Sequence, residues 1–336
     1  MVKITDVARH AGVSPSTVSY ALSGKRPISE ETRRRVEDSI RALGYRPHAG
    51  ARALASSKSN VLALVVPLRA GIHVPVVMQF AVSVVTTARA HDHDVLLLTQ
   101  EEGEEGLRRV ADTALVDALI LMDVQLDDPR LPLLRSLERP SVMIGFPADA
   151  TGLTCIDLDF KAAGELCVEH LASLGHRTVA PVGSPPEVYV RRTAFAQRVV
   201  QGFTAAADRH RLSSVVHPCE ASPAAARTAA ERLLREQPAL TGVVVHNEPV
   251  LEPLIDAFEQ LGLRVPDDLS VTAICPPELA ESVRVPVTSV ALPSAEIGTR
   301  AVELLMRKLD GAPVDGATLL AARLTVRAST ARRSLG

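Results

Sequence analysis

Two hydrophobic patterns divide the chain, one in roughly the first 46 residues and another from residue 61 onward. In the first part, apolar residues recur at helical spacing. Val36, Ile40 and Leu43 lie on one face of a predicted helix that Ser29 caps and Gly44 ends. In the second part, short runs of Val, Leu and Ile alternate with segments of helix length, which is typical of parallel βα units. The pattern predicts a small helical head followed by an α/β body.

The head has the turn and capping residues of three short helices. A first helix, ending at Ala11, is followed by Gly12, which allows the left-handed backbone of a tight turn. Ser14 is a good N-cap and Pro15 suits the first helical position of the next helix. Helix, tight turn and a second helix opening Ser-Pro-Ser-Thr is a helix-turn-helix, whose second helix enters the major groove of DNA. The predicted shared core is Ile4, Val7, Ala8, Val13, Val18, Leu22, Val36, Ile40 and Leu43.

The body contains two series of predicted strands. The first comprises residues 61–66, 95–99, 118–122, 141–144 and 154–157. The second begins near 178–182 and continues at 215–217, 242–246 and 270–274. Two late candidates, 288–291 and 318–326, flank a helix at about 295–309. We expect two doubly wound α/β subdomains with parallel sheets, and a ligand cleft where the carboxyl ends of their strands face each other.

The distribution of charge sets the head apart from the body. Residues 1–60 carry eleven Lys or Arg against five Asp or Glu, whereas the other residues carry twenty-six against thirty-four. A basic head on a mildly acidic body indicates that the head alone meets a polyanion such as DNA. Arg33, Arg34 and Arg35 are expected to form a solvated helix face paired with neighbouring acids, whereas Lys25 and Arg26, after the second helix, are expected to contact phosphate.

Composition narrows the class of protein further. With 46% hydrophobic and 23% charged residues, the chain excludes wholesale disorder and collagen-like repeats. No apolar run approaches the roughly 18 residues of a membrane span, and no secretory signal opens the chain. Four cysteines (Cys155, Cys167, Cys219 and Cys275) lack paired spacing, which fits buried thiols in a reducing cytosol. We therefore expect a cytoplasmic protein with no membrane partner.

The motif run of the head is similar to that of the lactose-repressor (LacI/GalR) family of transcriptional regulators. The similarity covers Ile4–Ser19 and continues through Ile28–Arg33 and Leu43–Pro47. It implies a helix-turn-helix domain over residues 1–57 with a hinge helix at 48–56, and a body resembling periplasmic sugar-binding proteins. Its first subdomain is expected at 61–158 plus about 291–317, and its second at 159–290 plus about 318–329.

The resemblance implies a set of DNA contacts in the head. Thr5, Ser14, Thr17, Ser29 and Thr32 match positions that contact phosphate, and Pro15, Ser16 and Tyr20 match positions that read bases. Many relatives carry arginine where this chain has Tyr20, which cannot make a bidentate contact with guanine, so we expect a different base preference there. The full predicted interface is Thr5, Ser14, Pro15, Ser16, Thr17, Ser19, Tyr20, Lys25, Arg26, Ser29, Thr32, Tyr45, Ala51 and Leu54.

Residues 48–56 resemble the hinge helix of the family, in which a leucine wedges into the minor groove. Leu54 takes that position, with Ala51 one turn before it. An isolated segment of this length, with Gly50 inside it, is a marginal helix. It would therefore order only on DNA, beside the hinge helix of a second copy. A plain linker with one apolar residue is the alternative.

The resemblance to the family is weaker at the positions that bind the effector. His73, Asn247 and Glu248 match cleft positions, and Phe146 and Phe160 could line the cleft. Arg191, Arg192 and Arg198 lie near the effector arginine of relatives, but Val199 occupies its expected slot. Arg192 and Arg198 are the candidates for that role.

At the end of the predicted strand at 270–274, the sequence differs from the pattern of the family. The chain has Ala273–Pro277 where relatives carry an aspartate that binds sugar hydroxyls, and it has no Trp and only three Tyr. An ordinary free-sugar inducer is therefore in doubt, and a less polar or anionic effector, or none, is favoured.

No catalytic constellation or cofactor motif is present in the sequence. The run His91–Asp94 suggests a metal site, but a polar turn before a strand explains it more simply. We therefore predict no enzyme activity, no cofactor and no metal. The sequence predicts a homodimeric, repressor-type regulator that binds double-stranded, palindromic operator DNA under the control of a small-molecule effector. One alternative is the same regulator with a degenerate cleft and a protein partner. The other, a sugar-processing enzyme with a fused head, lacks catalytic residues.

Overall fold

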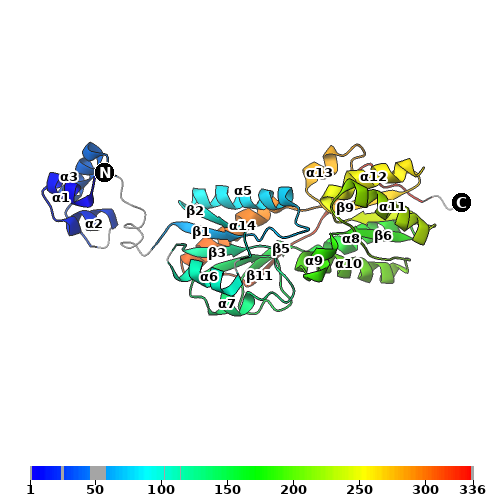
Figure 1. The fold of residues 1–336 in the computed structure, drawn as a ribbon, viewed down its shortest axis with the longest axis horizontal. Coiled ribbons are helices and arrows are strands. Elements are labelled where there is room, and N and C mark those ends of the chain that lie inside the picture. The colour runs from blue at the N-terminus through cyan, green and yellow to red at the C-terminus, as the bar shows by residue number, and fades with distance from the viewer. Residues whose placement is uncertain (1, 24–25, 46–57, 102, 114, 334–336) are drawn as a thin grey trace.

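The computed structural model describes residues 2–23, 26–45, 58–101, 103–113 and 115–333, which form a three-helix head and an α/β body (Figure 1). The head consists of α1 (Ile4–Ala11), α2 (Pro15–Ser23) and α3 (Glu30–Leu43). Its buried core contains Val7, Ala8, Val18 and Val36, as the hydrophobic pattern predicts. The prediction for Leu22 is wrong. That side chain is 42% exposed because the packed face of α2 continues through Ala21.

The first sheet of the body is entirely parallel and has the strand order β11-β5-β4-β3-β1-β2. Its strands are β1 (Val61–Val65), β2 (Asp94–Leu98), β3 (Ala118–Leu121), β4 (Ser141–Ile144), β5 (Cys155–Leu158) and β11 (Ala317–Leu320). The associated helices are α5 (Val74–Ala90), α6 (Gly103–Asp112), α7 (Leu131–Ser136) and α14 (Ser294–Leu309). Buried runs such as Ala118–Leu121 are apolar throughout because helices cover both faces of a parallel sheet.

The second sheet has the order β12-β10-β9-β8-β6-β7, and only β12 runs antiparallel to its neighbour. Its strands are β6 (Val179–Gly183), β7 (His217–Pro218), β8 (Gly242–Val245), β9 (Ser270–Cys275), β10 (Thr288–Ala291) and β12 (Leu324–Thr325). Helices of this subdomain are α8 (Phe160–Ser173), α9 (Pro186–Val190), α10 (Ala194–His210), α11 (Pro223–Glu236), α12 (Leu251–Gln260) and α13 (Pro277–Ser282), with a short 3₁₀ turn at Glu248–Val250. In this way the predicted α/β body is confirmed.

The chain crosses between the two subdomains three times. It passes to the second after β5, returns after β10, and crosses again between β11 and β12. The single strand expected at 318–326 is therefore two strands that belong to different sheets. Residues 318–320 lie in the first sheet, where β11 pairs with β5, so the last crossing comes after Leu320 rather than near residue 317.

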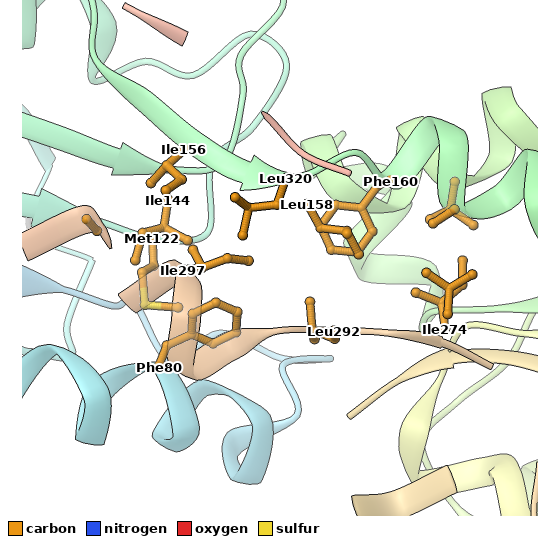
Figure 2. Packing of buried hydrophobic residues seen from close by; sticks show 14 of the residues in the cluster. Phe80, Met122, Ile144, Ile156, Leu158, Phe160, Ile274, Leu292, Ile297 and Leu320 are labelled. Carbon is orange, nitrogen blue, oxygen red and sulfur yellow. The ribbon is translucent and has the colours of Figure 1, made fainter. Parts of the chain in front are cut away.

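One continuous apolar cluster runs from the first sheet through the crossings to the second. Ile144 and Ile156 lie on the side of the first sheet, and Ile274 lies on the side of the second (Figure 2). Leu158 and Leu292, which sit at two of the crossings, are buried between them. This packing places an apolar wall at the place where the two subdomains face each other. In the described part of the chain, no helix is long and apolar enough to span a membrane.

Candidate functional site

The helix-turn-helix of the head is built on one glycine and two serine caps. Gly12 has a φ of 66° and its N–H donates to the carbonyls of Ala8 and Arg9, which ends α1 and turns the chain. Ser14 Oγ then accepts from the backbone N–H of Thr17 at 3.1 Å, capping α2. Ser29 Oγ accepts from Thr32 N–H at 3.2 Å and caps α3 in the same way. Each cap leaves a hydroxyl and a helix N-terminus at the surface, the arrangement that binds phosphate.

The residues predicted to contact DNA are mostly exposed or half-buried. Within the described ranges these are Thr5, Ser14, Pro15, Ser16, Thr17, Ser19, Tyr20, Arg26, Ser29 and Thr32. The Arg26 guanidinium lies over the ring of Tyr20, 5.4 Å from its centroid, so a cation and a predicted base-reading side chain share one surface. Lys25, Ala51 and Leu54, together with the rest of the 48–56 hinge, lie outside the described residues.

Besides Leu22, two further head predictions differ from the structure. Tyr45, expected at the DNA interface, is only 9% exposed and packs in the head core, where its ring fills space between the helices. Arg33, Arg34 and Arg35 are exposed as expected, but within the described ranges they form no ion pair with the neighbouring acids. The ion pair on α3 joins Arg41 to Asp38 at 2.6 Å instead.

The cleft between the two subdomains is held closed by a short backbone pairing. Residues 192–194 run antiparallel to residues 124–126, with Leu126 N–H donating to the carbonyl of Arg192 at 2.9 Å. The N–H of Ala194 donates to the carbonyl of Val124 at the same distance. Beside this pairing lies a cavity of about 140 Å³ between loops of both sheets. Its position matches the ligand cleft predicted at the carboxyl ends of the strands.

The cavity wall contains four of the predicted effector residues: His73, Phe160, Asn247 and Glu248. His73 Nδ1 lies 3.8 Å from a carboxylate oxygen of Glu248 across the cleft. The side chain of Asn247 links two backbone segments, since its Nδ2 donates to the carbonyls of Gly183 at 3.0 Å and Cys219 at 2.7 Å. Those two hydrogen bonds use both donors of the amide, and only its oxygen remains for a ligand.

Phe146, Arg192 and Arg198 are not part of this cavity wall. Arg192 has a φ of 56°, which turns its side chain outward to pair with Asp127 at 2.6 Å. Arg198 donates to the carbonyls of Phe146 and Pro147 and lies over the Phe146 ring. These three residues therefore join the subdomains outside the cavity, and the expectation that they line it is wrong.

Sequence reasoning missed several groups that the structure brings into the cavity. Asp157, Phe195 and His246 all line it, and so does Arg191, which the sequence places near the effector arginine but does not distinguish from its neighbours. Asp157 is the one charged residue of the buried strand Cys155–Leu158, and a lone carboxyl in a buried strand is the signal that could have identified it. Arg191 directly precedes the outward-facing Arg192, and no sequence pattern separates the two.

Burial shifts the pKa values of four cavity residues, and it lowers the pKa of His73. Desolvation raises the pKa of Asp157 to about 7, against a smaller opposing effect of its hydrogen bond from the Leu158 N–H. The same cause raises the pKa of Glu248 to about 7. Desolvation also lowers the pKa of His246 to about 4, so that its imidazole is neutral at pH 7. Together with Asp123, the wall holds three carboxyls beside one arginine.

Metal chemistry finds no support in the described ranges, where no group of three His, Cys, Asp or Glu could hold an ion. In the run His91–Asp94, which the sequence suggests as a metal site, His93 Nδ1 lies 2.7 Å from the carbonyl oxygen of His91. The Nε2 of the same ring lies 3.7 Å from a carboxylate oxygen of Asp117. The first contact lies within the turn between α5 and β2, and the second joins that turn to the residue before β3.

Comparison with known proteins decides the family. Residues 3–48 match the model of bacterial regulatory proteins of the lacI family, and residues 168–330 match a periplasmic binding protein-like domain. The HTH-type transcriptional regulator AglR of Rhizobium meliloti is 30% identical over 98% of this chain and 94% of its own length. The chain belongs to the lacI family. Catabolite control protein A of Priestia megaterium is 26% identical over 98% of this chain and 99% of its own length.

Solved structures agree with the fold of this lacI-family regulator. The lac repressor dimer bound to operator and the anti-inducer ONPF has a TM-score of 0.82 at 23% identity, covering 98% of this chain and 99% of that one. The relative AglR is named as a transcriptional regulator rather than an enzyme, which confirms the prediction that this chain is a DNA-binding regulator of that class.

Proposed function

We propose that this lacI-family regulator is a homodimeric repressor that binds a palindromic operator through its head, and that a small molecule in the cleft controls the binding. The observation that supports it is one surface of the head, formed by the exposed Ser14, Pro15 and Ser16 at the start of α2 and by the half-buried Tyr20 with the exposed Arg26 over its ring. A helix presenting its N-terminal side chains in this way can lie in the major groove, while the capping hydroxyls meet phosphate.

The proposed dimer is supported by an apolar face on the first subdomain. Val74, Met78, Val82 and Val85 of α5 are exposed, and so are Leu96 and Leu97 of the neighbouring strand β2. An exposed apolar face of this kind marks a protein contact, and a second copy of the chain would place two heads on two half-sites. The double variant Val82→Glu/Val85→Glu is expected to lower the molar mass measured by light scattering to that of a monomer.

Control by a small molecule is supported by the cleft itself. A cleft without a ligand would be expected to fill with side chains or to satisfy its own polar groups. Here a cavity remains, and within the described ranges His73 Nδ1, His246 Nδ1 and two nitrogens of Arg191 are buried without a hydrogen-bond partner. We therefore do not retain the alternative of a degenerate cleft governed by a protein partner.

The experiment is selection of bound fragments from a genomic DNA pool by the full-length protein. The selected operator is expected to bind the protein with Ser16→Ala/Tyr20→Ala at least about 100-fold more weakly, since each lost base contact costs about 1–3 kcal/mol. Glu37→Gln, an exposed change on α3, is the matched control and should leave the affinity unchanged. Equal binding by the wild-type protein and the double variant would contradict the assignment of α2 as the reading helix.

A further inference from the structure

Arg191 lines the cleft cavity, and one edge of its guanidinium has no hydrogen-bond partner in the described structure. Arg191 follows the last residue of α9, and its Nη1 donates to the carbonyl of Ala70 on the other subdomain at 2.9 Å. Its Nε and Nη2 are buried, and neither has a hydrogen-bond partner within the described ranges. Because Nε and Nη2 carry parallel N–H bonds along one edge of the planar guanidinium, this unpaired edge has the geometry that receives both oxygens of a carboxylate.

The two donors on this edge are buried, so their lack of acceptors costs free energy that a bound ligand could recover. A buried donor without a partner costs about 1–3 kcal/mol, and more for a charged group. Arg192, the next residue, faces solvent and pairs with Asp127, whereas Arg191 is held by one backbone carbonyl and has no carboxylate within ion-pair distance in the described structure. A bound anion would supply the missing acceptors. A single hydroxyl would satisfy only one of the two donors.

The volume of the cavity and its apolar wall limit the size and chemistry of the uncharged part of the ligand. The cavity measures about 140 Å³. For comparison, an apolar protein cavity of about 150 Å³ binds benzene. Phe160, Phe195 and His246 form a mutually packed group on one side, with ring centroids 5.6–5.7 Å apart. Aliphatic side chains such as Val76 and Val188 complete much of the remaining wall. One planar ring fits this space better than a disaccharide.

The first subdomain supplies a polar group that accepts hydrogen bonds. Asp157 lines the cavity at the end of β5, and its carboxyl accepts a hydrogen bond from the Leu158 N–H at 2.9 Å. No ion pair of Asp157 is formed with the described residues. Of the other acids of the wall, Asp123 pairs with Arg69 at 2.6 Å, and Glu248 belongs to the second subdomain, with its carboxylate 3.8 Å from His73 Nδ1, beyond hydrogen-bond distance. Asp157 is therefore free to accept from a hydroxyl or an amino group.

We propose that the effector of this cleft is a one-ring carboxylic acid with a hydroxyl or amino group, its carboxylate on Arg191 and its donor on Asp157. The inference rests on the proposed function, in which the cleft is the effector site. The ligand would bridge the two subdomains, because Asp157 belongs to the first and Arg191 to the second. A polyhydroxylated sugar would leave most hydroxyls against apolar side chains, and the donors of Asn247 are already used by backbone carbonyls.

The test is calorimetric titration of the full-length protein with 4-hydroxybenzoate, 4-aminobenzoate and 4-hydroxyphenylacetate, each compared with its methyl ester and with glucose. At least one acid is expected to bind, with its ester about tenfold weaker or more, since a charge-assisted hydrogen bond contributes about 1.5–3 kcal/mol. Arg191→Gln should weaken the acid by a similar factor. Arg192→Gln, the neighbouring change outside the cavity, should leave its affinity within about twofold.

Three results would overturn the inference: no acid binds, glucose binds while the acids do not, or Arg191→Gln binds the acid as well as wild type. Thermal unfolding of Arg191→Gln checks that this variant is folded. Operator binding is measured on the same preparations. If the protein binds the operator but gives one of the three results, only the inference about the ligand fails and the proposed function stands. If the protein binds an acid but not the operator, the proposed function is contradicted.

Discussion

Arg198 and Phe146 connect the two subdomains outside the cavity. The Arg198 guanidinium carbon lies 5.9 Å from the centroid of the Phe146 ring, and its Nη2 lies 3.3 Å from the carbonyl oxygen of the same residue. Phe146 follows β4 of the first sheet, whereas Arg198 is on α10 of the second subdomain. The contact adds to the backbone pairing of residues 192–194 with residues 124–126. It therefore stabilises the closed arrangement.

The first prediction concerns this contact. Arg198→Met should lower the free energy of unfolding by about 1–2 kcal/mol, because a hydrogen-bonded, half-buried cation over a ring is lost. Arg192→Gln removes an exposed ion pair and should cost at most about 1 kcal/mol. Urea unfolding of both variants measures the difference. Equal losses would mean that the Arg198 contact contributes no more than a surface pair.

A second prediction follows from the buried carboxyl of Asp157. Its folded pKa of about 7 lies above the unfolded value of about 3.9, so between these values the folded protein holds a proton that the unfolded chain releases. The free energy of unfolding should therefore fall as the pH rises from about 4 to about 7. Asp157→Asn cannot ionise and should escape this loss.

Urea unfolding at several pH values checks the Asp157 prediction. The stability of Asp157→Asn relative to wild type should rise between pH 4 and pH 8 by an amount on the order of 3 kcal/mol. Glu248, whose pKa is also raised to about 7, is present in both proteins, and its contribution largely cancels in the comparison. Parallel stability curves across this range would show that Asp157 ionises normally in the folded protein.

A third prediction concerns the close approach of α8 and α10. A Cβ added at Gly202 would overlap the backbone carbonyl of Lys161, and one at Gly164 would lie 2.5 Å from the carbonyl oxygen of Val199. Gly202→Ala should therefore destabilise the protein by about 3 kcal/mol or more, since neither backbone can yield without separating the helices. Gln201→Ala, the exposed neighbour, is the control and should be close to neutral. A melting temperature for Gly202→Ala equal to that of the control would disprove the close packing.

A fourth prediction distinguishes the role of Arg26, a proposed phosphate contact, from that of Tyr20, a proposed base contact. Arg26→Ala should weaken specific and random duplexes alike and reduce the slope of log affinity against log salt by about 1, as expected for one phosphate contact. Tyr20→Ala should weaken the operator but hardly change binding to random DNA. Anisotropy titrations over a range of salt concentrations distinguish these patterns. An unchanged salt slope in Arg26→Ala would place Arg26 away from phosphate.

Much of the fold could be predicted because its signals are local and strong. Parallel strands buried on both faces appear as short apolar runs, and the run at residues 141–144 coincides with β4. The stretch at residues 318–326 was harder, because apolar continuity does not show that β11 and β12 belong to different sheets. That assignment depends on β11 pairing with β5, a contact far away in the sequence.

The cleft residues were less predictable because side-chain direction depends on backbone conformation. Arg191 and Arg192 are identical residues side by side, but the positive φ of Arg192 turns one outward and leaves the other in the cavity. Asp157 lies in a strand whose two faces are both buried, and only the tertiary structure places its carboxyl at the cavity. Helix caps such as Ser29, by contrast, were predicted correctly, since their partners lie three residues away.

The central claim is that the head of this lacI-family regulator reads a DNA sequence. The most direct measurement is the affinity of the full-length protein for its selected operator and for a duplex of the same length and composition with scrambled bases, at one salt concentration. We expect the operator to bind about 10³-fold tighter or more. Equal affinities for the two duplexes would contradict it.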